Sequence, residues 1–304
     1  MYDVIIIGGG PCGVTAGVYA KRSGLKTLLF EQSVVGGQVI NTYEVKNFPT
    51  YANLSGADFC LKLYEQAQAN DLEIRDEEVI SVDFLSNPKR ISTKKQTYET
   101  KAIILSTGSN PNCLGIENEG KFIGKGISFC ALCDGNFFKD RVVAVVGGGD
   151  NAVEDIIYLS SLCKKVYVVV RGDKLSAQEI LQKSLKRHIE ETNRIEILYN
   201  AEVSKIYGEK EIEKIDITQN GEKISIDVDG LFLAIGKKPN NELYINKLSC
   251  NKNGYLIVDN KMMTSVEGVF AGGDVIEKSV RQIITACSDG ALCATFANKY
   301  IKGE

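Results

Sequence analysis

The stretch YDVIIIGGGPCG, residues 2–13, decides the fold of the first part of the chain. Its apolar run has the length of a buried strand and leads directly into a G-x-G-x-x-G pattern. A helical stretch follows to about Ser23, with Gly24 as its expected end, and a second strand, KTLLFE, ends at Glu31. Strand, glycine turn, helix and strand in this order predict a dinucleotide-binding unit built on a parallel sheet.

The glycines and the acid indicate how such a unit would bind its ligand. Gly8, Gly10 and Gly13 let the backbone approach a pyrophosphate, and the N–H groups and positive end of the following helix hold it. Glu31 lies 18 residues beyond Gly13, where a carboxylate can bind ribose hydroxyls. Taken alone, the glycine pattern is also compatible with an ordinary turn of an α/β protein, so the prediction depends on its flanking strand and helix.

The same plan recurs in the middle of the chain. RVVAVVG (141–147) is a predicted strand, GGGDNA (147–152) is a G-x-G-x-x-A, a helix runs to about Leu162, and KVYVVVR ends at Arg171. In both halves hairpin-like strands follow, and then an apolar strand with a similar tail: IILSTGSNPN (103–112) and LFLAIGKKPN (231–240). The segment GVFAGGDV (268–275) fits as a last strand of the first sheet, which makes the second copy an insertion into the first.

The expected fold class is therefore α/β, with two Rossmann-like dinucleotide-binding domains. Each domain is expected to contain a parallel sheet and a small antiparallel β-meander. Residues 1–110 and 241–304 would form a discontinuous FAD-binding domain, and residues 111–240 an NAD(P)-type domain carrying the pair Cys130 and Cys133. Two such units predict two dinucleotides, one a tightly held flavin and the other a transient nicotinamide.

Bulk properties narrow the classes of function. The 304 residues carry a net charge of −3 with both signs mixed, which does not indicate nucleic acid or an anionic membrane as a partner. No apolar run approaches the roughly 20 residues that span a bilayer. The chain enters a strand at once, without room for a signal peptide, so a cytoplasmic location is expected. Nine cysteines at irregular spacing do not resemble a secreted disulfide framework.

Cys130 and Cys133 are the one cysteine pair with a chemically meaningful spacing, in FCALCDG (129–135). A zinc site would need two more ligands, and the sequence offers only His188 and no second close pair, so no metal is expected. A structural disulfide would close a very short loop and stabilise little. Dithiol–disulfide exchange fits best, since one thiol can attack a substrate disulfide and the other can resolve the product. Asp134 could supply or accept the proton, or could be a helix cap or a solvated acid.

With these motifs in this order, the chain resembles the low-molecular-weight thioredoxin reductases over nearly its whole length. Beyond the cysteine pair and GGGDNAVE, the resemblance rests on further motifs: IIGGGPCG, GGQVINTYEVKNFP (36–49), STG (106–108), AIGKKPN, AGGDV and RQIITA (281–286). The family has an FAD domain split around a nicotinamide domain. The resemblance implies a flavoprotein thioredoxin-disulfide reductase that acts on thioredoxin and is a homodimer.

The resemblance also assigns roles to residues. Cys133 would face the flavin, Cys130 would attack the partner disulfide, and Asp134 would be the acid–base group. FAD would be bound by Gly8, Gly10, Pro11, Cys12, Gly13, Glu31, Gly37, Gln38, Asn47, Thr107, Gly108, Gly273, Asp274, Gln282 and Ile283. The nicotinamide dinucleotide would be bound by Gly147, Gly149, Asp150, Asn151, Ala152, Arg171 and Gly236. For Gln38 and Asn47, capping of their own loop is the alternative.

A departure from the family pattern leaves the electron donor open. NADPH-using members carry H-R-R-x-x-x-R after the second strand of the nicotinamide domain. The segment VRGDKLS (170–176) keeps Arg171 but has Gly172 and Ser176 at the other two arginine positions. Guanidinium groups are the usual partners of a 2′-phosphate, so NADPH is expected to bind weakly, with Lys174 as a partial substitute. NADH, reduced ferredoxin as donor, or oxidation of dithiols by oxygen are the alternatives.

Overall fold

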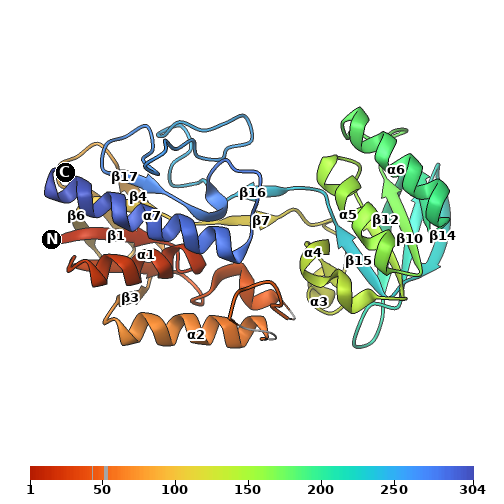
Figure 1. Ribbon diagram of the computed structural model, residues 1–304, viewed down its shortest axis with the longest axis horizontal. Coiled ribbons are helices and arrows are strands. Elements are labelled where there is room, and N and C mark those ends of the chain that lie inside the picture. Colours follow the sequence, from red (N-terminus) through yellow and green to blue (C-terminus); the bar gives the residue numbers. More distant parts are fainter. Residues whose placement is uncertain (43, 51–53) are drawn as a thin grey trace. The chain divides into compact units, whose positions relative to one another are not determined.

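The computed structural model describes residues 1–42, 44–50 and 54–304, so Tyr43 of the GGQVINTYEVKNFP motif lies outside the described residues. The chain divides into two compact units, one formed by Met1–Asn110 with Lys238–Glu304 and the other by Pro111–Lys237 (Figure 1). The second unit is inserted into the first. It ends at Lys237, three residues before the boundary expected at residue 240.

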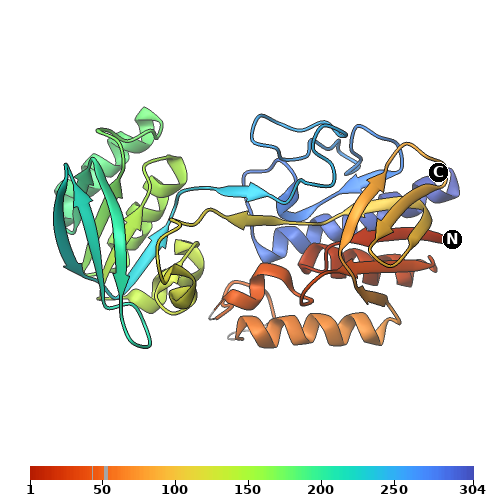
Figure 2. The same cartoon turned by 180° about the vertical axis from the view of Figure 1, so that it is seen from behind.

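A seven-stranded sheet forms the centre of the first unit (Figure 2). The strands lie in the order β3 (Glu73–Asp76), β2 (Thr27–Glu31), β1 (Tyr2–Ile7), β6 (Thr97–Leu105), β5 (Lys89–Thr93) and β4 (Val79–Asp83), and β17 (Val269–Ala271) also pairs with β6. Strands β3, β2, β1, β6 and β17 are parallel, whereas β4, β5 and the start of β6 are antiparallel. The pairing of β17 with β6 confirms that GVFAGGDV supplies a last strand to the first sheet.

The predicted meander of the first half is continuous with the main sheet. The single strand β6 pairs with β5 through its first residues and with β1 and β17 through its later ones. Its burial follows this division, because residues alternate between exposed and buried at first and are then buried without interruption from Ala102 to Leu105. A strand with one solvated face alternates in this way, and a strand inside a parallel sheet does not.

The described residues of the first unit form the helices α1 (Pro11–Arg22), α2 (Gly56–Ala69) and α7 (Ile283–Lys302), with short turns η1 (Gly37–Asn41) and η3 (Gly273–Val275). Helix α1 packs along α7 (Figure 1). As predicted, α1 ends just before Gly24, which has the left-handed φ of +78° that suits a residue after a helix end. The core combines strand residues with residues of α1, α2, α7 and the loops, and its fully buried strand members include Ile5, Ile6, Leu28, Leu29, Ile103 and Ile104.

The second unit is built of a five-stranded parallel sheet and a separate three-stranded antiparallel sheet. The parallel order is β11 (Ile195–Tyr199), β10 (Lys165–Val170), β9 (Val142–Val146), β15 (Gly230–Leu233) and β8 (Ile127–Ser128). Its helices are α3 (Glu119–Phe122), α4 (Ala131–Asp134), the 3-10 turn η2 (Gly135–Phe138), α5 (Asp150–Leu162) and α6 (Glu179–Thr192). Helix α5 ends at the predicted residue.

The three-stranded sheet contains β12 (Ala201–Tyr207), β13 (Lys214–Gln219) and β14 (Glu222–Asp227). Gln219 pairs with Glu222, so Asn220 and Gly221 form the two-residue turn that their sequence predicts, both with positive φ. One face of the parallel sheet packs with α5 and α6, and the other packs with the antiparallel strands. The segments at the unit boundary, β7 (Ser109–Pro111) and β16 (Lys237–Pro239), pair with each other.

In the part of the chain that the structure describes, no helix is both long enough and apolar enough to cross a membrane.

Candidate active site

The first glycine turn has room for a ligand on one side and none on the other. A Cβ at Gly8 would collide with the carbonyl oxygen of Ser106, and one at Gly13 would collide with the carbonyl oxygen of Gly8. At Gly10, by contrast, a Cβ would meet nothing within 4 Å. Two of the glycines therefore allow close packing of strand and helix, and the third leaves the turn open to an approaching group.

Helix α1 begins beside this opening. Gly10 is its N-cap residue, no side chain caps it, and its first turn contains no acidic residue. Pro11 occupies the first helical position, where the missing N–H costs nothing. The positive end of the helix is thus available to an anion, and the turn fits the pyrophosphate of a dinucleotide.

The carboxylate of Glu31 lies next to the turn, at the end of β2. Its Oε2 accepts the Gly9 N–H at 2.7 Å, and its Oε1 accepts the Ser33 N–H at 2.9 Å. The acid therefore fixes the backbone of the turn, in addition to the ribose contact expected from its position.

The remaining predicted FAD residues of the first unit come from segments far apart in the sequence. Asn47 donates from Nδ2 to Oε1 of Gln282 at 3.0 Å, and Gln38 donates from Nε2 to Oδ1 of Asn110 at 2.7 Å. Both side chains bond to distant segments, although Gln38 also accepts from Asn41 within its own turn at 3.2 Å. The bond to Asn41 is the kind expected if Gln38 caps its own turn, whereas Asn47 bonds to a distant segment.

Strand order explains why these segments meet. Strands β17, β6, β1 and β2 are parallel neighbours, so their carboxyl ends lie at one edge of the sheet. The predicted residues at or after these ends are Gly8, Gly10, Pro11, Cys12, Gly13, Glu31, Thr107, Gly108, Gly273 and Asp274. Gly37 lies in η1, Gln282 is the N-cap of α7 and Ile283 is its first residue. Thr107 is fixed by a bond of 2.8 Å from its hydroxyl to the carbonyl of Asn240.

The second unit carries a similar turn between β9 and α5. Gly147 has a φ of +142°, and a Cβ there would collide with the Ala234 carbonyl. The N–H groups of Ser176 and Ala177 both donate to the Gly148 carbonyl, at 2.8 and 3.0 Å. The carboxylate of Asp150 accepts the backbone and side-chain N–H of Gln178, both at 2.8 Å. The loop after β10 is therefore fastened to the glycine turn.

Strands β10, β9 and β15 are parallel neighbours, which brings their carboxyl ends together. The predicted nicotinamide residues follow these ends: Gly147, Gly149, Asp150, Asn151 and Ala152 after β9, Arg171 after β10 and Gly236 after β15.

The charges after β10 do not form a cluster of one sign. The Arg171 side chain is 88% exposed, and its Nε lies 4.0 Å from a carboxylate oxygen of Glu202. Asp173 and Lys174 are exposed as well. The hydroxyl of Ser176 donates inward to the Gly148 carbonyl at 3.2 Å. Two cations accompanied by two carboxylates give this region little net attraction for a 2′-phosphate.

The sulfurs of Cys130 and Cys133 are joined in a disulfide, with the Cα atoms 5.3 Å apart. Cys130 is the N-cap residue of the short helix α4, and its Sγ accepts the Cys133 N–H at 3.2 Å. A negative charge on a sulfur in this position is stabilised by the same donor. The other seven cysteines are free thiols: Cys12, Cys60, Cys113, Cys163, Cys250, Cys287 and Cys293.

Asp134 directly follows the second cysteine of the pair, and its environment raises the pKa of its carboxyl. Its Oδ2 accepts the Ser128 hydroxyl at 2.6 Å, while its buried Oδ1 has no hydrogen-bond partner among the described residues. Burial raises the pKa of Asp134, and the bond from Ser128 opposes part of that rise. Although Asp134 precedes η2, its side chain makes no capping bond there, which does not support the helix-cap alternative.

Ser128 is a site residue that the sequence analysis did not find. Besides its bond to Asp134, its hydroxyl oxygen accepts the Cys130 N–H at 3.1 Å. It therefore links the proton-holding acid to the backbone of the first cysteine. A lone serine at the end of a short strand carries no sequence signal for such a role.

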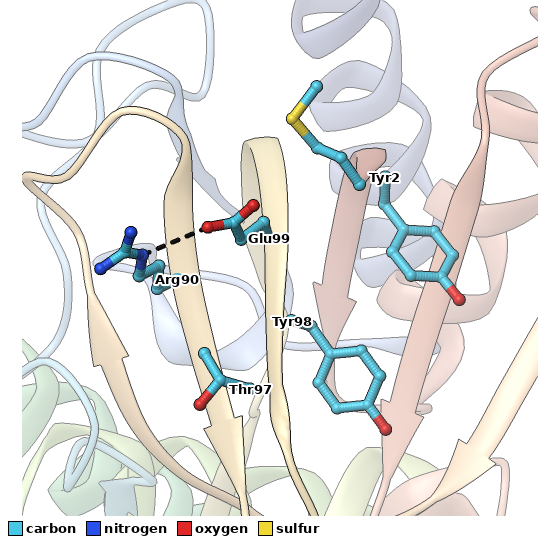
Figure 3. A pocket seen from close by; sticks show the side chains of 6 residues that line it. Tyr2, Arg90, Thr97, Tyr98 and Glu99 are labelled. Atoms are coloured by element: carbon cyan, nitrogen blue, oxygen red, sulfur yellow. Dashed lines mark hydrogen bonds and ion pairs between the residues drawn. The ribbon is translucent and has the colours of Figure 1, made fainter.

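An open hollow of about 570 Å³ in the first unit does not belong to this site (Figure 3). It lies at the start of β1 and β6, the opposite end from the glycine turn, and two of its lining residues, Arg90 and Glu99 on neighbouring strands, form an ion pair with Nε 3.4 Å from Oε1 (Figure 3). Its lining residues are Met1, Tyr2, Arg90, Thr97, Tyr98 and Glu99. Within residues 1–42, 44–50 and 54–304, no cluster of His, Cys, Asp and Glu side chains could hold a metal ion.

The sequence profile of one family, pyridine nucleotide-disulphide oxidoreductase, matches residues 2–290. The chain belongs to this family. It is 39% identical over 305 residues to a thioredoxin reductase of Listeria monocytogenes, covering 99% of this chain and 94% of the relative. It is equally similar, at 39%, to a 34.2 kDa protein in the rubredoxin operon of Clostridium pasteurianum, covering 99% and 98%.

A solved structure agrees with the fold over the whole chain. The crystal structure of thioredoxin reductase from Streptococcus pyogenes superimposes with a TM-score of 0.92 at 36% identity, covering 100% of this chain and 99% of that one. These findings confirm the predicted α/β fold, the resemblance and the class of enzyme. They also confirm FAD and a pyridine nucleotide as the cofactors of this oxidoreductase.

Proposed function

We propose that this oxidoreductase is a thioredoxin reductase. Electrons pass from a nicotinamide dinucleotide through FAD to the Cys130–Cys133 disulfide and on to the disulfide of thioredoxin. The observation that carries the proposal is this disulfide, followed directly by Asp134 with its raised pKa, in a second unit that is inserted into the first. Relatives named thioredoxin reductase over the same length support it.

The first unit would hold FAD, with its pyrophosphate at the open side of Gly10 and the end of α1. Bound there, FAD supplies two-electron exchange between a nicotinamide and a disulfide. Two other FAD residues named from the sequence, Glu31 at the end of β2 and Asp274 after β17, lie at the ends of parallel strands of the same sheet. The second unit would hold the nicotinamide dinucleotide at the turn that begins with Gly147.

Disulfide exchange proceeds through the two cysteines in order. Two electrons and two protons open the Cys130–Cys133 bond to a dithiol. Cys130, whose negative sulfur the Cys133 N–H stabilises, then attacks the thioredoxin disulfide and forms a mixed disulfide, which releases one substrate thiol. Cys133 attacks the Cys130 sulfur, which restores the enzyme disulfide and releases the second thiol.

Asp134 would manage the protons of this exchange. Burial raises the pKa of Asp134, which favours its protonated form, and the Ser128 hydroxyl donates a hydrogen bond to its carboxyl. A departing thiolate takes a proton from the acid, and the carboxylate recovers one when Cys130 or Cys133 is next deprotonated.

The charges after β10 favour NADH over NADPH as the donor. Of the residues expected to contact a 2′-phosphate, Arg171 faces Glu202, Gly172 has no side chain, and the Ser176 hydroxyl bonds to the turn. Introducing arginine at both uncharged positions, as Gly172→Arg with Ser176→Arg, should therefore lower the KM for NADPH on the order of tenfold or more, and that for NADH little.

Steady-state reduction of thioredoxin with NADH, NADPH and reduced ferredoxin in turn tests the proposal. Thioredoxin reduction with NADH at a lower KM than with NADPH supports it. If only reduced ferredoxin supports turnover, ferredoxin and not a nicotinamide is the donor. If the protein oxidises dithiols with oxygen and does not reduce thioredoxin, it is a dithiol oxidase and not a reductase. A homodimer and a cytoplasmic location complete the proposal.

A further inference from the structure

A largely buried ion pair joins the turn after β17 to α7 and has no part in the chemistry described above. The Lys278 Nζ is 2.6 Å from the Asp289 Oδ2, and the side chains are only 14% and 15% exposed. The same carboxylate oxygen accepts the Gly273 N–H at 2.9 Å. Asp289, on α7, therefore holds both the lysine and the backbone of the turn η3 that follows β17.

The pair lies against the first turn of α1. A Cβ at Gly272 would lie 2.9 Å from the Asp289 Cβ and 3.1 Å from the Cys12 Sγ, and one at Gly273 would lie 3.0 Å from the Cys12 Cβ. Cys12 is the second residue of α1, the helix whose N-terminus faces the open side of the glycine turn. The carboxylate of Asp289 is thus close to the end of the helix where an anionic pyrophosphate is expected.

The thiols near the pair add no further negative charge beside the carboxylate. Burial raises the pKa of Cys12 and of Cys293, so both are uncharged. The guanidinium of Arg281 is committed to the carbonyls of Lys278 and Ile276, at 2.9 and 3.1 Å. Among the contacts described for Asp289, Lys278 alone supplies a positive charge.

We propose that Asp289 is a positioning residue of the FAD site and that Lys278 is its charge partner. Asp289 fixes the Gly273 peptide, and with it the turn that carries Asp274. Lys278 cancels the negative charge that would otherwise repel the cofactor phosphates from the end of α1. A carboxylate suits the positioning role because it can accept hydrogen bonds from the lysine and from the Gly273 N–H together. It needs the lysine as a charge partner because its own negative charge would repel the phosphates. This inference rests on the proposed FAD site.

The test measures FAD binding to the apoprotein by quenching of flavin fluorescence, without reference to turnover. Lys278→Met leaves an uncompensated buried carboxylate and should weaken binding on the order of tenfold or more. Adding Asp289→Asn removes that charge but keeps an oxygen that can accept the Gly273 N–H. The double variant should therefore recover binding to within about threefold of the wild type. Asp289→Ala in the Lys278→Met background loses the acceptor as well and should bind more weakly than the double variant with asparagine.

A matched control is Lys101→Met, which removes the cation from Asp3 (2.8 Å apart) at the opposite end of the sheet and should leave FAD binding unchanged. Two results would overturn the inference: Lys278→Met binding as tightly as the wild type, or no rescue by Asp289→Asn. Thermal unfolding of the apoprotein shows whether Lys278→Met folds. If it does not, FAD binding is compared between Asp289→Asn and Asp289→Ala, each combined with Lys278→Met. Equal binding by these two double variants would refute the role of Asp289. Failure of the wild type itself to bind FAD would instead refute the proposed function.

Discussion

Asp155, on helix α5, offers a test of the electrostatics of the second unit. Burial, and secondarily the neighbouring charge of Glu154, raises the pKa of its carboxyl from 3.8 to about 6, while Lys237 opposes the rise. At about 1.4 kcal/mol per pKa unit, a rise of roughly two units corresponds to as much as about 3 kcal/mol against the folded state once the carboxyl is ionised.

The sign of the pH dependence follows from this rise. Between pH 3.8 and about 6 the folded form holds the proton more tightly than the unfolded form, so stability falls as pH increases through this range. The penalty is complete above about pH 6 and absent below the unfolded pKa. Asp155→Asn, which cannot ionise, should therefore stabilise the unit by as much as about 3 kcal/mol near pH 7.5 and by little near pH 4.

Urea unfolding followed by circular dichroism at several pH values measures this difference. Asp173→Asn removes an exposed carboxyl of the same unit and serves as the control, with a change of less than about 0.5 kcal/mol. A gain for Asp155→Asn that does not vary with pH would show that packing rather than ionisation is responsible. No gain near pH 7.5 would refute the reasoning.

Three further predictions concern the site itself. Asp134→Asn should lower turnover with thioredoxin by on the order of a hundredfold, because it removes the proposed acid–base group, and unchanged turnover would refute that role. It should also raise the free energy of unfolding at neutral pH, because burial raises the pKa of this carboxyl. Gly13→Ala should lose FAD and be destabilised by a few kcal/mol, as flavin absorbance and thermal unfolding would show, whereas Gly120→Ala, which meets nothing within 4 Å, should do neither. Cys133→Ser should accumulate a mixed disulfide between Cys130 and thioredoxin, visible by intact mass, and its absence would reverse the order of attack.

The turns and helix ends of this fold could be predicted from short sequence patterns, because neighbouring residues determine their backbone conformation. The glycine turn before α1 could be inferred because its backbone conformation and close packing need residues without side chains, as the contacts of Gly8 and Gly13 show. The Asn220–Gly221 turn could be inferred because both of its residues adopt positive φ readily, and α5 ends at Leu162 as expected. Strand β6 was harder, because its first half is exposed on one face and its second half is buried on both, so it reads as two separate strands.

The polar contacts that complete the site could not be predicted. Ser128 bonds to Asp134 across a turn, and Asp289 reaches Gly273 from a different element. Such bonds depend on how elements pack, and a single serine or aspartate shows no periodicity that would indicate them. The family pattern located the segment after β10, but the pairing of Arg171 with Glu202 needed the structure.

The central claim is that the Cys130–Cys133 pair exchanges electrons with FAD bound to the same chain. Anaerobic reductive titration, followed by flavin absorbance and by the number of free thiols, tests it most directly. The wild type should take up two electrons for the flavin and two more for the disulfide, with two new thiols, whereas Cys130→Ser with Cys133→Ser should take up the flavin's two alone. Equal electron uptake by both proteins, or a wild type whose thiol count does not change while the flavin is bleached, would contradict the account.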